Sequence, residues 1–165
     1  HMKVLKEKFL LDYKNTTGHS EIHLKDFFTR PIVRFLLLFR LGEKNKLFYI
    51  LQRLYGRKFG LEMKSENCGA GLQIGHPFNI TINPDAVIGN GVILTKGVTI
   101  GVEKGKSPIV GNNVRIGANS TITGGISIGD NVVIAPNTFV NFNVLSNTVV
   151  VPGKAEIHNR HTKIA

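Results

Sequence analysis

One histidine stands alone in the C-terminal part of this chain, where it could act as a base. His76 lies in the stretch LQIGHPFNITINPDAVIGNG, and no other histidine lies between residues 61 and 153. Imidazole has an unperturbed pKa of about 6.5, so it can take a proton from a hydroxyl near neutral pH. A base that activates a hydroxyl for direct attack needs no covalent enzyme intermediate. The lack of a Ser or Cys nucleophile motif therefore does not argue against a catalytic role for His76. His76 is the candidate general base, and the alternative is an exposed corner residue without a catalytic role.

Aliphatic residues around His76 recur at every sixth position, often followed by Gly or another small residue. Such a hexapeptide repeat is a signature of a parallel β-helix, in which each unit forms a short strand and a corner. The aliphatic side chain points into the prism and contacts its copies in neighbouring coils, about 4.8 Å away. The positions expected inside are Ile82, Ile88, Leu94, Ile100, Val110, Ile116, Ile122, Ile128, Ile134 and Val140, with a second set four residues later at Ala86, Val92, Val98, Val114, Ser120, Ile126, Val132, Thr138 and Val144.

Two units are longer than six residues. The step from Ile74 to Ile82 is eight residues and contains His76, and the step from Ile100 to Val110 is ten and contains VEKGKSP. Insertions in a solenoid form surface loops and often carry function. These two insertions are therefore the expected places for chemistry.

The first 60 residues have helical periodicity. HSEIHLKDFF begins with a potential cap at Ser20, Pro31 suits the first turn of a helix, and apolar residues in KLFYILQRLYGRKF lie three and four apart. We expect two or three helices here. The predicted fold is mainly β, with a short helical region at 1–60, a β-helix at 61–153 and a tail at 154–165.

Positive charge gathers in the helical region. The formal net charge is +10, and residues 1–60 hold 13 Lys and Arg against 5 Asp and Glu. This surface could bind an anionic membrane or substrate, or simply be solvated, and no motif indicates nucleic-acid binding. The longest apolar run, FLLLF, is far shorter than the roughly 20 residues of a bilayer span. The single Cys68 and the absence of a visible secretory signal predict a cytoplasmic protein, peripheral to the inner face of the membrane if the basic helices contact it.

The repeat, the unit IGHPFNITIN and the stretch AVIGNGVILTKGVTIG together resemble the serine acetyltransferase group of hexapeptide acyltransferases. Within that group the sequence is most similar to capsule and surface-polysaccharide O-acetyltransferases. Those enzymes carry a short helical segment before the first coil, and it resembles the stretch RPIVRFLLLFRLGEKNKLFYILQRLYGRKFGLEM of this chain. The resemblance implies a left-handed parallel β-helix, a homotrimer with active sites between subunits, and acetyl-CoA as co-substrate without a metal. His76 then occupies the position of the catalytic histidine.

The resemblance also implies positions for the co-substrate. The loop GVEKGKSP is similar to a mobile loop beside the acetyl-CoA groove, so Lys104 and Lys106 could meet phosphates. Small or corner residues that would let the pantetheine arm approach the backbone are Gly101, Ala118 and Pro136, and Lys154 would lie near the nucleotide end. Corner geometry alone is the alternative explanation for each of the three corner residues.

The partner that orients His76 is left open. In serine acetyltransferases an aspartate about one coil earlier does so, and strict counting places Leu61 there, with Glu62 beside it. Either the strand shifts by one residue and Glu62 orients His76, or a backbone carbonyl does, and we favour the carbonyl.

The predicted acceptor is a carbohydrate hydroxyl, such as a unit of a surface polysaccharide. Serine acetyltransferases place an aspartate before the histidine and an Arg-His pair in the long loop, whereas this chain has Gly75 and GKSP. The neutral residues Asn79, Thr81 and Asn83 suit sugar hydroxyls, because amides offer both a donor and an acceptor.

Three other functions stay as alternatives. One is serine O-acetylation. Another is a β-helix binding module without catalysis, for which removal of His76 would have no effect. The third, a zinc carbonic anhydrase, needs three histidine ligands, and the repeat region has one.

Overall fold

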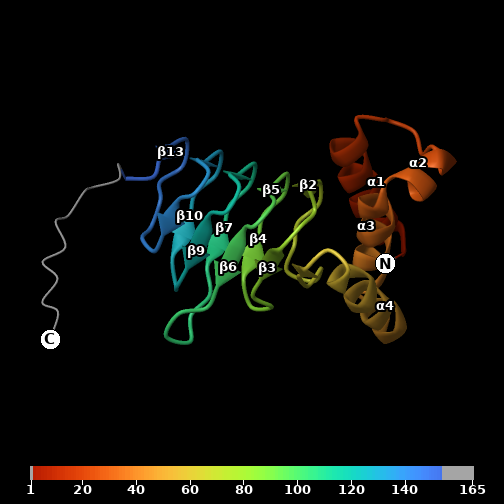
Figure 1. Ribbon diagram of the computed structural model, residues 1–165, viewed down its shortest axis with the longest axis horizontal. Coiled ribbons are helices and arrows are strands. Elements are labelled where there is room, and N and C mark those ends of the chain that lie inside the picture. Colours follow the sequence, from red (N-terminus) through yellow and green to blue (C-terminus); the bar gives the residue numbers. More distant parts are fainter. Residues whose placement is uncertain (1, 154–165) are drawn as a thin grey trace, which may run out of the picture.

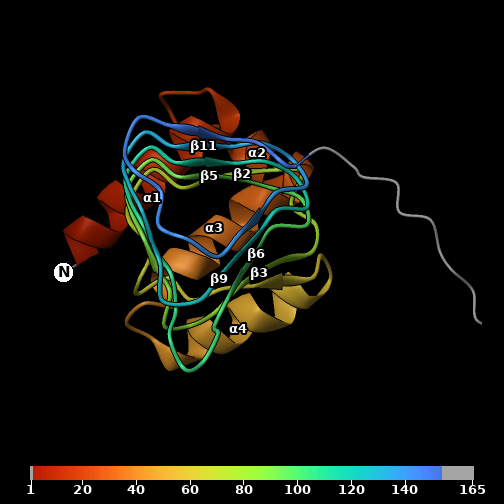
Figure 2. The same ribbon diagram turned by 90° about the vertical axis from the view of Figure 1, so that its left-hand side faces the viewer.

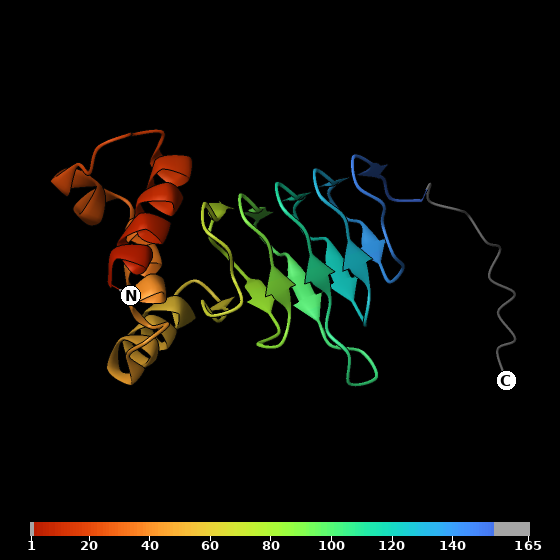
Figure 3. The same ribbon diagram turned by 180° about the vertical axis from the view of Figure 1, so that it is seen from behind.

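The protein consists of a helical region at one end of a parallel β-solenoid (Figure 1). The computed structural model describes residues 2–153. Figure 3 shows the coils stacked side by side, with the helices beyond the first coil. The helices are α1 (Met2–Thr17), α2 (Leu24–Thr29), α3 (Pro31–Leu41) and α4 (Lys46–Arg57).

The solenoid has three sheets of parallel strands and about five turns, and its outline is triangular when viewed along the axis (Figure 2). Sheet A has the order β1-β3-β6-β9-β12, sheet B β10-β7-β4, and sheet C β13-β11-β8-β5-β2. The strands are β1 (Leu61–Glu62), β2 (Gln73–Gly75), β3 (Ile80–Ile82), β4 (Val87–Ile88), β5 (Ile93–Thr95), β6 (Thr99–Gly101), β7 (Ile109–Val110), β8 (Arg115–Ile116), β9 (Thr121–Thr123), β10 (Ser127–Ile128), β11 (Val133–Ile134), β12 (Phe139–Val140) and β13 (Val149–Val150).

The predicted interior of the prism is confirmed. All ten aliphatic positions of the repeat are at most 4% exposed, and the nine positions of the second set are also buried. Ile82, Ile100 and Ile122 stack in successive coils of sheet A, where each is in register with the next. Each coil therefore buries its apolar side chains mainly against its neighbours.

Asparagine makes many of the corners. Five corner asparagines have φ between 54° and 61°, the left-handed region that Asn tolerates better than most residues. Two side-chain hydrogen bonds join three of them in a ladder, from Asn113 Nδ2 to Asn131 Oδ1 at 3.2 Å and from Asn131 Nδ2 to Asn147 Oδ1 at 3.0 Å. The five are Asn113, Asn119, Asn131, Asn137 and Asn147.

The helical region is attached to the first coil through a buried arginine, and we call this contact the Arg40 clamp. Arg40, on α3, bonds to both carboxylate oxygens of Asp12 on α1, at 2.7 and 3.2 Å. It also donates to the carbonyl oxygens of Cys68 at 2.9 Å and Gly69 at 2.5 Å. Asp12 in turn accepts from Leu72 N at 2.8 Å. One guanidinium thus connects two helices with the solenoid.

The prediction of two or three helices is wrong, because the described residues contain four. The first helix, α1, was missed because its buried face includes the charged Asp12 beside Phe9 and Tyr13, which breaks the apolar pattern. Ser20 is not a cap, since α2 begins after His23, whose side chain makes no capping hydrogen bond. Pro31 does begin α3, as expected. No helix within residues 2–153 is long and apolar enough to cross a bilayer.

Candidate functional site

His76 stands at the corner between sheets C and A, immediately after β2. The two inserted residues let the chain turn here with positive φ at both His76 (54°) and Asn79 (53°), and Phe78 N donates to His76 O at 2.8 Å. The imidazole is exposed, and no hydrogen bond to its ring is found within the described residues. The backbone therefore presents His76 to the outside of the prism.

A cavity of about 460 Å³ lies beside His76, between the first coils and the helical region, and we call it the His76 cavity. Arg30 is the one charged residue among those that line the cavity, and its Nε lies 3.3 Å from Asp26 Oδ1, while no Asp or Glu is itself a lining residue. The helices thus supply one wall of the space next to the candidate base. The lining residues are Thr16, Thr29, Arg30, Pro31, Ile32, Phe59, Gln73, Ile74, Gly75, His76, Pro77 and Phe78.

A ledge of backbone runs along the same corner from His76 towards the C-terminal coils. The register of sheet C places Lys96, Ala118 and Pro136 below His76, one in each successive coil. Backbone hydrogen bonds connect the levels, including Asn137 N to Ala118 O at 2.8 Å. Ala118 is partly exposed, and its small side chain leaves room above this level of the ledge. Sequence reasoning missed Lys96, although counting one coil on from His76 would have found it.

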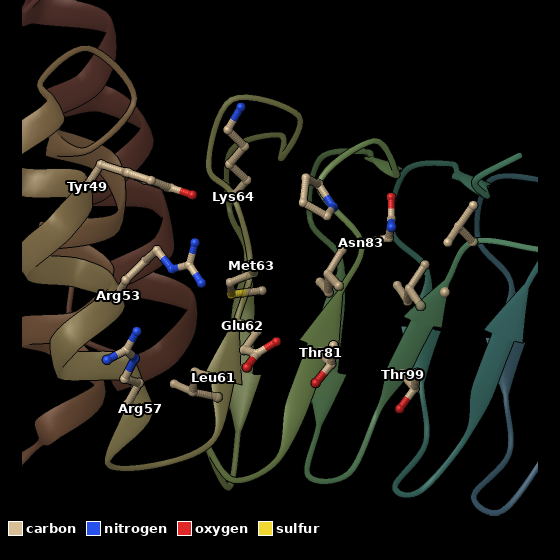
Figure 4. Close-up of a pocket in the computed structure, with 15 residues that line it drawn as sticks. Tyr49, Arg53, Arg57, Leu61, Glu62, Met63, Lys64, Thr81, Asn83 and Thr99 are labelled. Carbon is tan, nitrogen blue, oxygen red and sulfur yellow. The ribbon is translucent and has the colours of Figure 1, made fainter. Parts of the chain in front are cut away.

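Glu62, Thr81, Asn83 and Gly101 lie elsewhere, in a groove of about 430 Å³ between α4 and sheet A, which we call the α4 groove (Figure 4). Glu62 pairs with Thr81 across β1 and β3, and it faces outward while Leu61 faces the core. Because His76 precedes β3 and Asn83 follows it, about 10 Å of strand separates them. The structure therefore does not bring Glu62, Thr81 or Asn83 to the imidazole of the same chain.

One of the predicted acceptor residues, Asn83, already has side-chain partners, whereas Asn79 is bonded through its backbone. Asn83 Oδ1 accepts from Asp85 N at 2.9 Å and from Ser107 Oγ at 3.0 Å, which connects the turn to the long loop. Asn79 is closer to His76, and its backbone N donates to Phe59 O at 2.8 Å. Asn79 is exposed, so its amide can still meet a ligand.

The second insertion forms a hairpin at the corner between sheets A and B. Glu103 and Lys106 exchange backbone hydrogen bonds of 3.0 Å, and Lys104 and Gly105 both have positive φ at the tip, as in a tight hairpin turn. Both lysines are exposed. This loop and Gly101 lie at a different corner from Ala118 and Pro136, so the predicted co-substrate residues fall into two groups. Lys154 lies outside the described residues.

No group of three or more His, Cys, Asp or Glu side chains in the described part of the chain is placed to hold a metal ion. Cys68 is buried at the start of the solenoid, and burial raises the pKa of its thiol to about 12. A thiol in this state is a poor nucleophile. His76 thus stays the candidate for the reacting group.

Comparison with known proteins points to one family. The model of the bacterial transferase hexapeptide (six repeats) matches residues 107–142. Serine acetyltransferase 2 of Arabidopsis thaliana is 34% identical over 122 residues, 70% of this chain and 38% of that protein. The serine acetyltransferase of Helicobacter pylori strain 26695 is 32% identical over 137 residues, 76% of this chain and 80% of that protein.

A solved structure agrees with these relatives. The Neisseria gonorrhoeae serine acetyltransferase in complex with serine superposes with a TM-score of 0.74 and 26% identity, over 94% of this chain and 69% of that one. These relatives are serine acetyltransferases, so the expected closer similarity to polysaccharide O-acetyltransferases is not supported. The similarity extends over most of both chains for the Helicobacter protein, and on that basis this chain belongs to the serine acetyltransferase family of hexapeptide-repeat acyltransferases.

Proposed function

We propose that the protein transfers an acetyl group from acetyl-CoA to a hydroxyl, with His76 as general base. The observation that carries this proposal is the position of His76, which lies at an inserted corner, exposed, beside a cavity and at the top of a backbone ledge. The ledge suits an extended thioester arm, because Ala118 has a small side chain and Pro136 is exposed at the next level.

The chemistry follows from the imidazole. His76 takes the proton from the acceptor hydroxyl as its oxygen attacks the thioester carbonyl carbon. The carbon–sulfur bond then breaks, and the protonated imidazole returns the proton to the departing thiolate of CoA. The same group acts first as base and then as acid, and the products are an acetyl ester and free CoA.

L-Serine is the first candidate acceptor. The Helicobacter relative is named a serine acetyltransferase, and the Neisseria structure holds serine. A carbohydrate hydroxyl is the second candidate, because the lining of the His76 cavity has no carboxylate to pair with the ammonium group of an amino acid. Asn79 beside this corner could bond to sugar hydroxyls.

A trimer would bring together the two groups of predicted co-substrate residues, which lie at different corners of one chain. If the corner that carries His76 meets sheet A of a neighbouring copy, then Gly101, Lys104 and Lys106 of that copy come close to the ledge. Glu62, or a backbone carbonyl as favoured from the sequence, would orient His76 in such an assembly. Family membership supports a cytoplasmic location for this reaction.

The test is acetyl transfer measured by release of free CoA. His76→Ala should lower kcat by at least a hundredfold, in line with the contribution of a general base, whereas His23→Ala, which removes an exposed histidine of the helical region, should not. Each enzyme is assayed with L-serine and with a panel of neutral and acidic sugars. Full activity in His76→Ala would overturn the proposal, and the acceptor with the higher kcat/KM decides between the two candidates.

A further inference from the structure

The α4 groove carries two arginines from one face of a helix. Arg53 and Arg57 are four residues apart on α4 (Lys46–Arg57), so their side chains leave the helix in the same direction. Figure 4 shows the Arg53 guanidinium extending from α4 towards β1, with Arg57 one turn further along the helix, and both residues line the groove. The Tyr49 ring lies 6.0 Å from the Arg53 guanidinium carbon and helps to place it.

Neither arginine has an acidic partner in the part of the chain that the structure describes. The salt bridges found there join other residues, including Lys64 with Glu66 at 2.9 Å, which neutralises the third cation of the groove. Two unpaired guanidinium groups that face the same concave space attract an anion, and their planar forks suit a carboxylate or a phosphate.

The facing wall offers hydroxyl groups at regular spacing. Thr81 and Thr99 are paired neighbours in sheet A, and both line the groove, about 4.8 Å apart as in any sheet. Glu62 precedes them in the ladder and adds a single carboxylate. A ligand between the walls would therefore meet cations on the helix side and hydroxyl groups on the sheet side.

We propose that the α4 groove binds a small hydroxyl-bearing ligand through its carboxylate or phosphate, held by Arg53 and Arg57. Its volume of about 430 Å³ is in the range of small-molecule sites. Two unpaired arginines against the one carboxylate of Glu62 leave a net positive lining. Within one chain the groove lies at the other end of β3 from His76, so binding can be measured separately from the reaction. In the trimer proposed above, Glu62 and Gly101 of this groove would approach His76 of a neighbouring copy, and to that extent the inference rests on the proposed function.

The test is calorimetric binding of three probes: a hexose phosphate, a hexuronate and L-serine. Arg53→Gln and Arg57→Gln should each weaken the probe that binds by about tenfold, and the double substitution by about a hundredfold, because each removes a charged hydrogen bond. Raising the salt from 50 to 500 mM should also weaken binding, because the guanidinium groups are exposed.

The matched control is Lys44→Gln with Lys46→Gln, which removes two positive charges near the same helix but outside the groove. It should leave affinity within about twofold. Glu62→Gln distinguishes the two kinds of probe. A purely anionic probe should bind more tightly when the neighbouring carboxylate is removed, whereas zwitterionic L-serine should bind more weakly.

Three results would overturn the proposal. One is that no probe binds, and another is that the control pair weakens binding as much as the arginine pair. The third is that the arginine substitutions weaken CoA alone, which would assign the groove to the co-substrate. His76→Ala should still bind the probe, so failure of the proposed reaction would be seen separately. Thermal unfolding of each variant checks that it folds.

Discussion

Replacing Arg40 by Met should weaken the attachment of the helical region to the solenoid and lower the stability of the protein. In the clamp, the Arg40 guanidinium contacts Asp12, two carbonyl oxygens of the first coil, Glu43 at 3.0 Å and Ser65 Oγ at 3.1 Å. Arg40 and Asp12 are 1% and 0% exposed. Burial lowers the pKa of the guanidinium, but hydrogen bonds and charge from Asp12 and Glu43 raise it overall, so it stays charged.

The expected loss is about 4 kcal/mol. Removing one partner of a buried ion pair costs roughly 3–5 kcal/mol, because the other charge is left without compensation. After the change, Asp12 retains one strong donor, Leu72 N at 2.8 Å. For a chain of this size the loss corresponds to a fall in Tm of roughly 8–16 °C, if the helices and the solenoid unfold together.

The assay combines urea unfolding, followed by circular dichroism, with amide hydrogen exchange. Exchange should accelerate in α1 and α3, while the central strands of the solenoid stay protected. Arg40→Met with Asp12→Asn should recover part of the loss, because the buried carboxylate is gone. Lys46→Met, at an exposed position, should change stability by less than about 0.5 kcal/mol.

A loss below about 1 kcal/mol in Arg40→Met would refute this reasoning. So would a double variant whose loss equals the sum of the two single losses, because the charges would then not be coupled.

Three further results are expected. The pKa of the Cys68 thiol is raised to about 12, so at pH 8 it should react with a disulfide reagent roughly a thousandfold more slowly than an ordinary thiol. Urea, which unfolds the protein, should restore the normal rate. Rapid reaction of one equivalent in the native protein would contradict this. Tyr13 donates to Asp26 at 2.6 Å and lowers its pKa, so stability from this carboxylate is present above about pH 3.9 and lost as the pH falls through the lower folded value. Tyr13→Phe should therefore move acid unfolding, followed by circular dichroism, to higher pH, and an unchanged midpoint would speak against it. Asn131→Ala should cost about 1–2 kcal/mol in urea unfolding, because Ala disfavours φ of 56°, whereas Asn131→Gly should cost less; equal losses would indicate that the side-chain ladder matters instead.

The solenoid could be predicted from the sequence because its core repeats locally. Each coil repeats the same positions, so Ile100 or Ile122 is placed by counting alone, and both are buried as expected. The same counting put Leu61 at the position of the orienting aspartate with Glu62 beside it, and the structure shows Leu61 in the core and Glu62 facing outward, since neighbouring strand residues face opposite sides. Counting also placed His76 at an insertion, because the extra length of a repeat unit can be read from that unit alone.

The helical region and the division of the site could not be predicted in this way. Arg40 and Asp12 are 28 residues apart, and no period connects them, so their pairing depends on how the helices pack. The His76 cavity and the α4 groove likewise form where helices meet coils. Asn83 follows His76 by only seven residues, yet β3 runs between them and carries the chain to the next corner.

Both insertions occupy bends, where the backbone has left one ladder and not yet joined the next. Thr81, Thr99 and Thr121 stay aligned although 18 residues separate the first two and 22 the last two. Extra residues at a bend form a loop there and do not change the register of the strands in the following coils. A chain built this way can exchange its inserted segments while the coils beneath them keep their shape, which gives the architecture room to diversify at little structural cost.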